Sequence, residues 1–440
     1  MKCLIIAAGR GSRLSSRGDS KPLIHLLGLS LIERVILTAR EGGLTDFYVV
    51  TGYNGDKVQK YLNRFSQSRN INITHITNKE WEKGNGISVL QAKKLLHENF
   101  ILLMGDHVFD ESILIRLKNE RVADGEVMVG VDRNIETKKT AEENDATKAL
   151  VEDNRILDIG KDIKEYNAYD TGIFLCSPAL FTGIEESLQH DDSSLSGGIK
   201  VLASKGKAKA FDIKDDYWVD VDDEKRFKRA ESKLLATLRK TTDGPISRYI
   251  NRPISTRITR YLLRTAISPS CISVFSFILA MLGALFFLFR GYTNLVIGAI
   301  LAQVSSVIDG CDGEIARLKF HITEFGGWFD AVLDRYADAF LLYGLTYYVY
   351  FTNRSFLSLF IGFLAIIGTF MNSYTADKYD GLMKRKLGPG RYYLRVGRDV
   401  RVFLIFLGAL LNKPLLFLAL IALLMNAENI RRIIALYKHG

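Results

Sequence analysis

Four aspartates in the second half of the chain are spaced as helical pairs. Asp309 and Asp312 are three positions apart, and Asp330 and Asp334 are four apart. Each pair would share one helix face, and the short segment between the pairs lets them face each other across an antiparallel helix pair. Close carboxylates repel one another unless cations neutralise them, and hard oxygen ligands suit Mg²⁺, Mn²⁺ or Ca²⁺. The spacing therefore indicates a metal centre.

The first residues of the chain form a second chemical pattern. An apolar run ends at Ala8, and Gly9 and Gly11 follow, with Arg13 and Lys21 shortly after them. Backbone N–H groups in such a glycine turn can cradle a triphosphate, while the two cations neutralise its charge. The turn is not a dinucleotide fingerprint, because leucine stands where that motif has its third glycine.

The elements around this turn predict an α/β domain. Helical patterns separate several of the strand-like apolar runs, which favours a Rossmann-like, largely parallel sheet over residues 1–230. The runs cover 2–9, 46–52, 100–106, 125–131 and 171–177.

The second half reads as an all-α membrane domain over residues 268–440. Most of its six apolar segments approach the ~20 residues that span a bilayer, although the fifth is short. Buried helices of a large soluble protein are the alternative, and six in succession with short connections argue against it. The segments cover 270–290, 292–310, 327–352, 355–376, 399–411 and 414–430.

Charge predicts the orientation of these segments. The chain has a net charge of +10, which favours anionic partners such as phosphates or an acidic membrane face. Three cations, Arg290, Arg354 and Lys413, flank one set of ends of the apolar segments, whereas eighteen flank the other set. We therefore expect both halves to face the cytoplasm at the cell membrane. The eighteen cations of the other set are Arg248, Arg252, Arg257, Arg260, Arg264, Arg317, Lys319, Lys378, Lys384, Arg385, Lys386, Arg391, Arg395, Arg398, Arg401, Arg431, Arg432 and Lys438.

The connecting stretch, 231–267, contains apolar residues at helical spacing with arginines between them, namely Ile250, Ile254, Ile258 and Leu262. This predicts an amphipathic helix on the membrane surface, with a plain basic linker as the alternative. The apolar run near the N-terminus is too short for a signal peptide. The four cysteines form no CxxC pair, so neither structural zinc nor a disulfide framework is supported.

The first half combines the Gly9–Gly11 turn, Lys21, and Asp106 at the end of the 100–106 run. In these features it resembles the nucleotidyltransferases that activate sugar phosphates and related phosphate esters. The resemblance implies catalytic roles for Arg13 and Lys21, and metal ligation by Asp106. Asp220 and Asp222 both fit the second metal position, and we favour Asp222. The family commonly has Asp-x-Asp at the first position, whereas His107 and Val108 follow here. The nucleotide-binding residues implied are Ala8, Gly9, Gly11 and Gly86.

The four-aspartate stretch matches the signature of the CDP-alcohol phosphotransferases at every fixed position. The resemblance implies a two-metal centre held by Asp309, Asp312, Asp330 and Asp334, with Asp334 also the general base. Asp338 lies outside the signature. The basic stretch 383–401 has two interpretations. Its cations bind a phosphate group of the acceptor, or they only set the topology of the membrane helices. The remaining signature residues, Gly313, Ala316 and Arg317, are expected at the nucleotide, and the phosphate-binding candidates are Arg391, Arg395 and Arg398.

A nucleotidyltransferase fused to a consumer of CDP-alcohols resembles the bifunctional inositol-1-phosphate cytidylyltransferases and CDP-inositol:inositol-phosphate transferases. That family implies CTP, inositol-1-phosphate and CDP-inositol as substrates, di-myo-inositol phosphate phosphate as product, and Mg²⁺ or Mn²⁺ as metal. We also expect contact with membrane lipid, a homodimer, and no nucleic acid partner. The alternatives are an enzyme of phospholipid head-group synthesis and a cation transporter, which would release no CMP.

Overall fold

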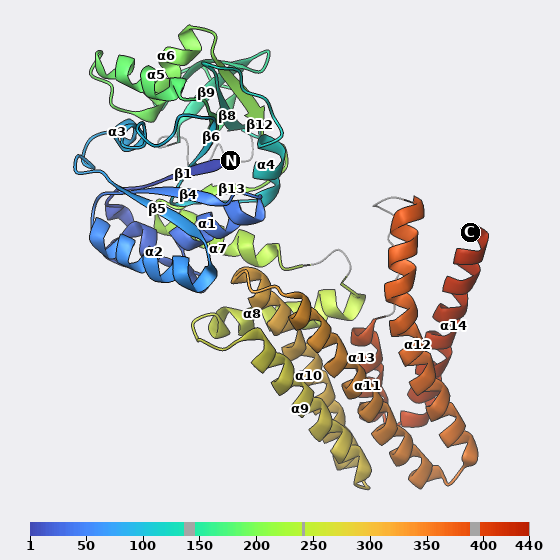
Figure 1. The fold of residues 1–440 in the computed structure, drawn as a ribbon. Helices are drawn as coiled ribbons and strands as arrows, with labels where there is room; N and C mark the ends of the chain where they lie inside the picture. Colours follow the sequence, from blue (N-terminus) through green and yellow to red (C-terminus); the bar gives the residue numbers. More distant parts are fainter. Residues whose placement is uncertain (136–145, 240–242, 388–396, 440) are drawn as a thin grey trace. The chain divides into compact units, whose positions relative to one another are not determined.

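The computed structural model describes residues 1–135, 146–239, 243–387 and 397–439, which form two compact units, Met1–Lys233 and Leu234–Gly440 (Figure 1). A nine-stranded sheet forms the centre of the first unit, with the order β5-β4-β1-β6-β11-β8-β12-β10-β9. The strands are β1 (Lys2–Ala7), β4 (Asp46–Thr51), β5 (Asn72–Thr77), β6 (Phe100–Met104), β8 (Val127–Asp132), β9 (Lys148–Glu152), β10 (Arg155–Gly160), β11 (Ala168–Cys176) and β12 (Ala208–Asp212).

The sheet is less parallel than the sequence pattern predicts. Strands β5, β4, β1 and β6 are parallel neighbours, but β11 is antiparallel to both β6 and β8. The reason lies in residues 148–176, where three strands follow one another without a helix between them. Asp153 and Asn154, both with positive φ, form the tight turn that pairs β9 with β10.

Helices and short strands complete the first unit. Helix α1 begins with a capping box, in which Ser30 Oγ accepts from the Glu33 N–H and the Glu33 carboxylate accepts from the Ser30 N–H. The elements are η1 (Ser12–Leu14), η2 (Lys21–Leu23), β2 (His25–Leu26), β3 (Leu29–Ser30), α1 (Leu31–Glu41), α2 (Gly55–Arg69), α3 (Asn85–Leu90), β7 (His107–Phe109), α4 (Glu111–Leu117), α5 (Ala179–Leu188), α6 (Leu195–Ser204), β13 (Trp218–Asp220) and α7 (Glu224–Ala236).

The second unit is helical, and each of the six apolar segments coincides with a helix. Four spans are long and apolar enough to cross a membrane: Pro269–Leu288, Tyr292–Leu318, Phe356–Ala376 and Pro414–Lys438. Of the other two segments, 327–352 contains charged residues of the candidate site, and 399–411 is short. The helices are η3 (a π-helix, Ser247–Asn251), α8 (Arg252–Leu262), α9 (Pro269–Leu288), α10 (Tyr292–Leu318), α11 (Glu324–Asn353), α12 (Phe356–Leu387), α13 (Arg398–Leu410) and α14 (Pro414–His439).

Small residues and a cap fix the helices that bear the aspartates. A methyl group at Gly298 would lie 2.7 Å from the Gly283 carbonyl oxygen, so α9 and α10 pack with their backbones in close approach. Thr323 caps α11 by accepting a hydrogen bond from the Gly326 N–H at 3.0 Å. The turn between α10 and α11 is therefore short and defined, and it brings the two halves of the four-aspartate motif together.

The connecting stretch is helical in η3 and α8, with Pro253 in the first turn of α8. Helix α8 buries a polar stripe made of Arg252, Ser255 and Thr259. Its other side leaves Ile254 and Tyr261 exposed, at 45% and 68%. The helix therefore packs inward through polar side chains and exposes both apolar side chains and the arginines Arg257 and Arg260.

Candidate active sites

Lys21 is the central cation of the first unit. Its Nζ lies 2.5 Å from Asp106 Oδ2 and also pairs with Asp222, which Arg13 contacts at 2.8 Å. Burial opposes the charge on Lys21, but attraction to Asp106 and Asp222 outweighs it, so the pKa of Lys21 is raised. The structure thus brings together four of the residues singled out in the sequence, with an ammonium group at the point between two carboxylates.

Asp106 lies in the turn between β6 and β7, and strand pairing adds two further groups to it. Strand β13 pairs antiparallel with β7 so that Asp220 lies opposite His107. Ligand atoms of Asp106, His107 and Asp220 all lie within 4.8 Å of one another. Asp220 Oδ1 is buried without a hydrogen-bond partner among the described residues. This set fits a divalent cation, whereas the favoured Asp222 is engaged by Lys21 and Arg13.

The turn glycines have different surroundings. A side chain on Gly9 would meet nothing within 4 Å, so the backbone there faces open space. Gly11 has φ +64° and a Cβ at this position would overlap Lys21. Ala8 is buried, and a Cβ on Gly86 would lie 2.7 Å from the Ser193 carbonyl oxygen. Gly9 and Gly11 therefore let the chain turn tightly beside Lys21.

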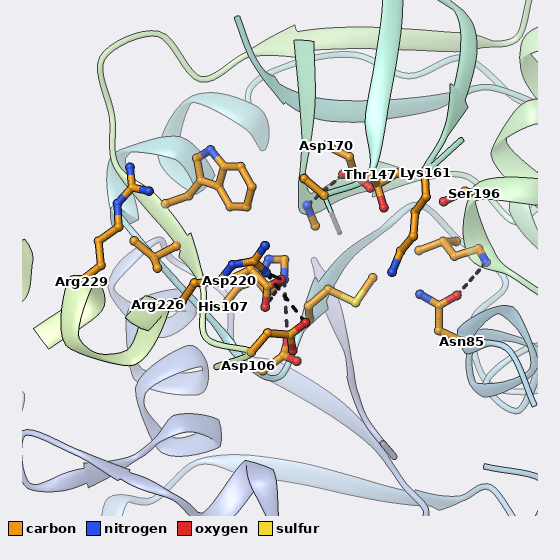
Figure 2. Close-up of a pocket in the computed structure, with 17 residues that line it drawn as sticks. Asn85, Asp106, His107, Thr147, Lys161, Asp170, Ser196, Asp220, Arg226 and Arg229 are labelled. Atoms are coloured by element: carbon orange, nitrogen blue, oxygen red, sulfur yellow. Dashed lines mark hydrogen bonds and ion pairs between the residues drawn. The ribbon is translucent and has the colours of Figure 1, made fainter. Parts of the chain in front are cut away.

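A pocket of about 210 Å³ opens beside these carboxylates (Figure 2). It contains groups that the sequence did not single out, because no short motif links them. Cationic side chains line two sides of this pocket. One of them, Arg226, is buried and contacts Asp220 Oδ2 at 3.0 Å. Burial raises the pKa of Asp170, which lies on β11, to about 6. The newly found lining residues include Asn85, Thr147, Lys161, Asp170, Arg226 and Arg229.

The four aspartates of the second unit meet as their spacing predicts, with one difference. Asp309, Asp330 and Asp334 present oxygens within 4.8 Å of one another, and Asp330 Oδ1 is buried without a hydrogen-bond partner in the described part of the chain. Asp312 contacts Asp330 but is not one of these three, and its carboxylate also accepts hydrogen bonds from the Ser273 hydroxyl and the Gly313 N–H. Three of the four carboxylates thus point to one centre.

Arg398 reaches this centre from α13. Its Nη1 lies 2.9 Å from Asp309 Oδ2 and 2.5 Å from Asp334 Oδ1, and its Nε lies 3.3 Å from Asp338 Oδ1. Asp338 is also paired with buried Arg401 at 2.5 Å. Asp338, which lies outside the signature, therefore holds a residue of the site. The other two predicted phosphate ligands, Arg391 and Arg395, lie outside the described residues.

Charge balance in this region favours divalent cations. Five aspartates (Asp309, Asp312, Asp330, Asp334 and Asp338) gather here, and two arginines (Arg398 and Arg401) pair with them, so carboxylates outnumber the paired guanidinium groups. Uncompensated charges are costly at a membrane boundary. The clustered carboxylate oxygens, including the unpartnered Asp330 Oδ1, fit a divalent metal ion of the hard class.

The remaining signature residues lie along the same helix. Nε and Nη2 of Arg317 are buried without hydrogen-bond partners among the described residues, which leaves two donors for a ligand. Among the described residues, a Cβ on Gly313 would meet only the end of the Arg317 side chain, in a close contact of 3.3 Å, and Ala316 is half-buried. These positions leave room beside the carboxylates, and a pocket of about 140 Å³ lined by Asp309, Asp334 and Arg398 lies nearby.

Glu314 is a further residue that the sequence did not single out. It is fully buried and accepts hydrogen bonds from Arg252 at 2.7 Å and from Ser255 and Thr259 at 2.6 Å each. These donors are the polar stripe of α8. Glu314 therefore fixes α8 against the helix that carries Asp309 and Asp312.

Comparison with known proteins agrees with this two-part geometry. Residues 3–167 match the MobA-like NTP transferase domain, and residues 266–436 match the CDP-alcohol phosphatidyltransferase family. An archaetidylinositol phosphate synthase from Pyrococcus horikoshii is 25% identical and covers 42% of this chain and 90% of its own.

Two relatives match both halves. The bifunctional IPC transferase and DIPP synthase of Rubrobacter xylanophilus is 36% identical over 435 residues, covering 98% of this chain and 95% of the relative. The protein of the same name from Thermococcus kodakarensis is 33% identical, covering 99% and 96%. The chain is an enzyme with a nucleotidyltransferase half and a membrane half, and it belongs to the family of bifunctional IPC transferases and DIPP synthases.

Proposed function

We propose that the chain catalyses two consecutive reactions. The first unit joins CTP to inositol-1-phosphate, giving CDP-inositol and pyrophosphate. The second transfers phosphoinositol from CDP-inositol to an inositol phosphate, releasing CMP and forming di-myo-inositol phosphate phosphate. The observation that carries this proposal is the presence of both carboxylate sites in one chain whose full-length relatives combine the two named activities.

In the first unit, the residues act mainly by binding and by charge. The substrate phosphate attacks the α-phosphorus of CTP, an oxygen–phosphorus bond forms, and the bond to pyrophosphate breaks. Lys21 and Arg13 balance the charge that develops on the phosphate oxygens, and the Gly9–Gly11 turn offers backbone N–H groups. Lys161 and Arg229 line the pocket and offer positive charge to the polyol phosphate. Mg²⁺, or Mn²⁺, held by Asp106 and a second aspartate would polarise the reacting phosphate when bound.

In the second unit, Asp334 accepts the proton of the acceptor hydroxyl as its oxygen attacks the β-phosphorus of CDP-inositol. The bond between the β-phosphorus and the bridging oxygen breaks, and CMP leaves. Arg398 binds the phosphate of the acceptor, and Arg317 offers its two unpartnered donors to the donor's phosphates. A two-metal centre on Asp309, Asp312, Asp330 and Asp334 would neutralise charge on the leaving group when bound.

The chain is a membrane protein, and we infer that all six helices α9–α14 cross the cell membrane with both catalytic units on the cytoplasmic side. The excess of Lys and Arg at one set of helix ends supports this orientation. The exposed Ile254 and Tyr261 of α8 support its position on the membrane surface. A homodimer remains an expectation from the membrane family.

A second candidate acceptor is a lipid. The archaetidylinositol phosphate synthase that matches the membrane half supports it, because that protein's name refers to a lipid product. The near-full-length relatives favour the soluble acceptor.

Membranes containing the protein, supplied with CTP, Mg²⁺ and inositol-1-phosphate, provide the test. We expect pyrophosphate first and then CMP, with a water-soluble phosphodiester product. CMP release that depends on added lipid, with an extractable product, would favour the second acceptor. Neither product from any polyol phosphate would refute both reactions.

A further inference from the structure

The imidazole of His107 is held in one tautomer by the backbone. Its Nδ1 lies 2.8 Å from the Thr171 carbonyl oxygen. A carbonyl only accepts hydrogen bonds, so Nδ1 carries the hydrogen and donates, and Nε2 of the neutral ring keeps a free lone pair.

That lone pair faces two carboxylate oxygens. Nε2 lies 3.7 Å from Asp106 Oδ1 and 3.6 Å from Asp220 Oδ1, both beyond hydrogen-bond distance. Asp220 Oδ1 is buried and has no hydrogen-bond partner among the described residues. An ion with bonds of about 2.1 Å keeps neighbouring ligand atoms roughly 3.0–3.5 Å apart, close to the separations observed. The three atoms therefore leave room for one shared ion.

The surrounding elements fix this arrangement. Strand pairing sets His107 opposite Asp220, and Gly172, with φ +70°, lets β11 approach so closely that a Cβ there would overlap the imidazole. Lys21 pairs with the other oxygen of Asp106, Oδ2, so Oδ1 stays available. Positioning of this kind is characteristic of metal-ligating histidines, whose second nitrogen donates to a carbonyl.

We propose that His107 Nε2 is a metal ligand in the nucleotidyltransferase site, together with Asp106 and Asp220. The inference rests on the first proposed reaction. A nitrogen ligand raises the affinity for Mn²⁺, Co²⁺ or Zn²⁺ relative to Mg²⁺, whereas the carboxylates of the second unit offer oxygen alone. The two halves of the chain therefore differ in metal preference.

Pulsed electron paramagnetic resonance on the full-length protein with Mn²⁺, without nucleotide, tests this directly. We expect nitrogen coupling to Mn²⁺ in the wild type and none in His107→Asp. Mn²⁺ bound at the aspartate cluster of the membrane half should add no nitrogen coupling to the signal, since that cluster offers only oxygen ligands. His75→Asn is the matched control, because His75 also lies in the first unit and its Nε2 lies 2.7 Å from Asn63 Oδ1, away from the three proposed ligands. Nitrogen coupling should persist in this variant.

A second measurement uses Mn²⁺ affinity and product release. His107→Asn should weaken Mn²⁺ binding at this site by about tenfold. In His107→Asp, pyrophosphate release should shift in favour of Mg²⁺, while CMP release from supplied CDP-inositol keeps its metal preference. Absence of nitrogen coupling in the wild type, or its survival in His107→Asp, would overturn the inference even if pyrophosphate is formed. Nitrogen coupling without pyrophosphate from any polyol phosphate would support the metal site and refute the first reaction alone.

Discussion

Both sites bring several carboxylates close together and pair them with a cation, but they do so on different kinds of secondary structure. In the first unit, Asp106, Asp220 and Asp222 lie in loops and at strand ends, and a lysine ammonium pairs with two of them. In the second, three aspartates lie on helices α10 and α11, and the cation is the guanidinium of Arg398. A lysine is a compact charge on a flexible stem, whereas an arginine forms several directed contacts at once. The cation of the first site is therefore a single point charge between two carboxylates, whereas the cation of the second contacts three carboxylates in fixed directions.

The largest expected effect comes from a substitution in the membrane half that should stop only one of the two reactions. Asp334→Asn removes the proposed base and one carboxylate of the centre, so CMP release from supplied CDP-inositol should fall by about 10³-fold or more. Pyrophosphate release from CTP and inositol-1-phosphate should stay unchanged. Glu324→Gln, at an exposed position on the same helix, is the control. Equal loss of both products in Asp334→Asn would show that the sites are not separate.

Asp106→Asn should produce the reverse pattern. The variant leaves Lys21 with one carboxylate partner fewer and removes a proposed metal ligand, so pyrophosphate release should fall by about 10²–10³-fold. CMP release should persist when CDP-inositol is supplied. Asp124→Asn changes an exposed aspartate of the same unit and should leave both products unchanged. If CMP release also fails in Asp106→Asn, the idea of two independent centres is wrong.

The same contrast explains what could be predicted from the sequence. The membrane aspartates are close in the chain, so helix periodicity within each helix and the short connection between the two helices predict that Asp309, Asp330 and Asp334 meet. The first site joins residues about eighty-five and two hundred positions apart, and only strand pairing between β7 and β13 brings Asp220 to Asp106. Spacing cannot reveal such a contact, which is why the sequence left Asp220 and Asp222 as alternatives.

Other features depended on packing that no local pattern encodes. The antiparallel part of the sheet comes from the successive strands β9, β10 and β11, which no helix separates, although the sequence pattern favoured parallel strands. The polar stripe of α8 was overlooked because its partner, Glu314, is distant in the sequence and buried. Asp338 could be placed on the correct helix face, but its contacts with Arg398 and Arg401 required the position of α13.

Those contacts lead to a prediction of intermediate size. Asp338→Asn removes the charge that holds Arg398 Nε, so the KM for the acceptor inositol phosphate should rise about tenfold while kcat changes less. The variant also leaves buried Arg401 without its carboxylate, which is expected to destabilise the unit. Steady-state kinetics of CMP release at varied acceptor concentration give the two constants.

A double variant separates positioning from stability. Asp338→Asn combined with Arg401→Met removes the buried pair and places a neutral side chain near Met425, which Arg401 contacts at 3.8 Å. Thermal stability should recover while the KM remains high. A KM that returns to the wild-type value together with stability would show that Asp338 has only a structural role.

The smallest expected effect concerns the open pocket of the first unit. Asp170 lines it, accepts a hydrogen bond from the Gly172 N–H at 2.8 Å, and has a pKa raised by burial to about 6. Its carboxylate is ionised above that pH and is lost progressively below it. If it accepts hydrogen bonds from inositol hydroxyls, the KM for inositol-1-phosphate should rise several-fold as the pH falls from 7 to 5.

Asp170→Asn isolates this effect. The amide still accepts a hydrogen bond but does not titrate, so the KM should be higher at pH 7 and should lack the step near pH 6. Titration of the substrate phosphate is common to both proteins and cancels in the ratio of their KM values. A ratio that does not change with pH would exclude Asp170 as a titrating contact. A ratio that falls toward one at acidic pH would identify the carboxylate charge as part of polyol recognition in the first site.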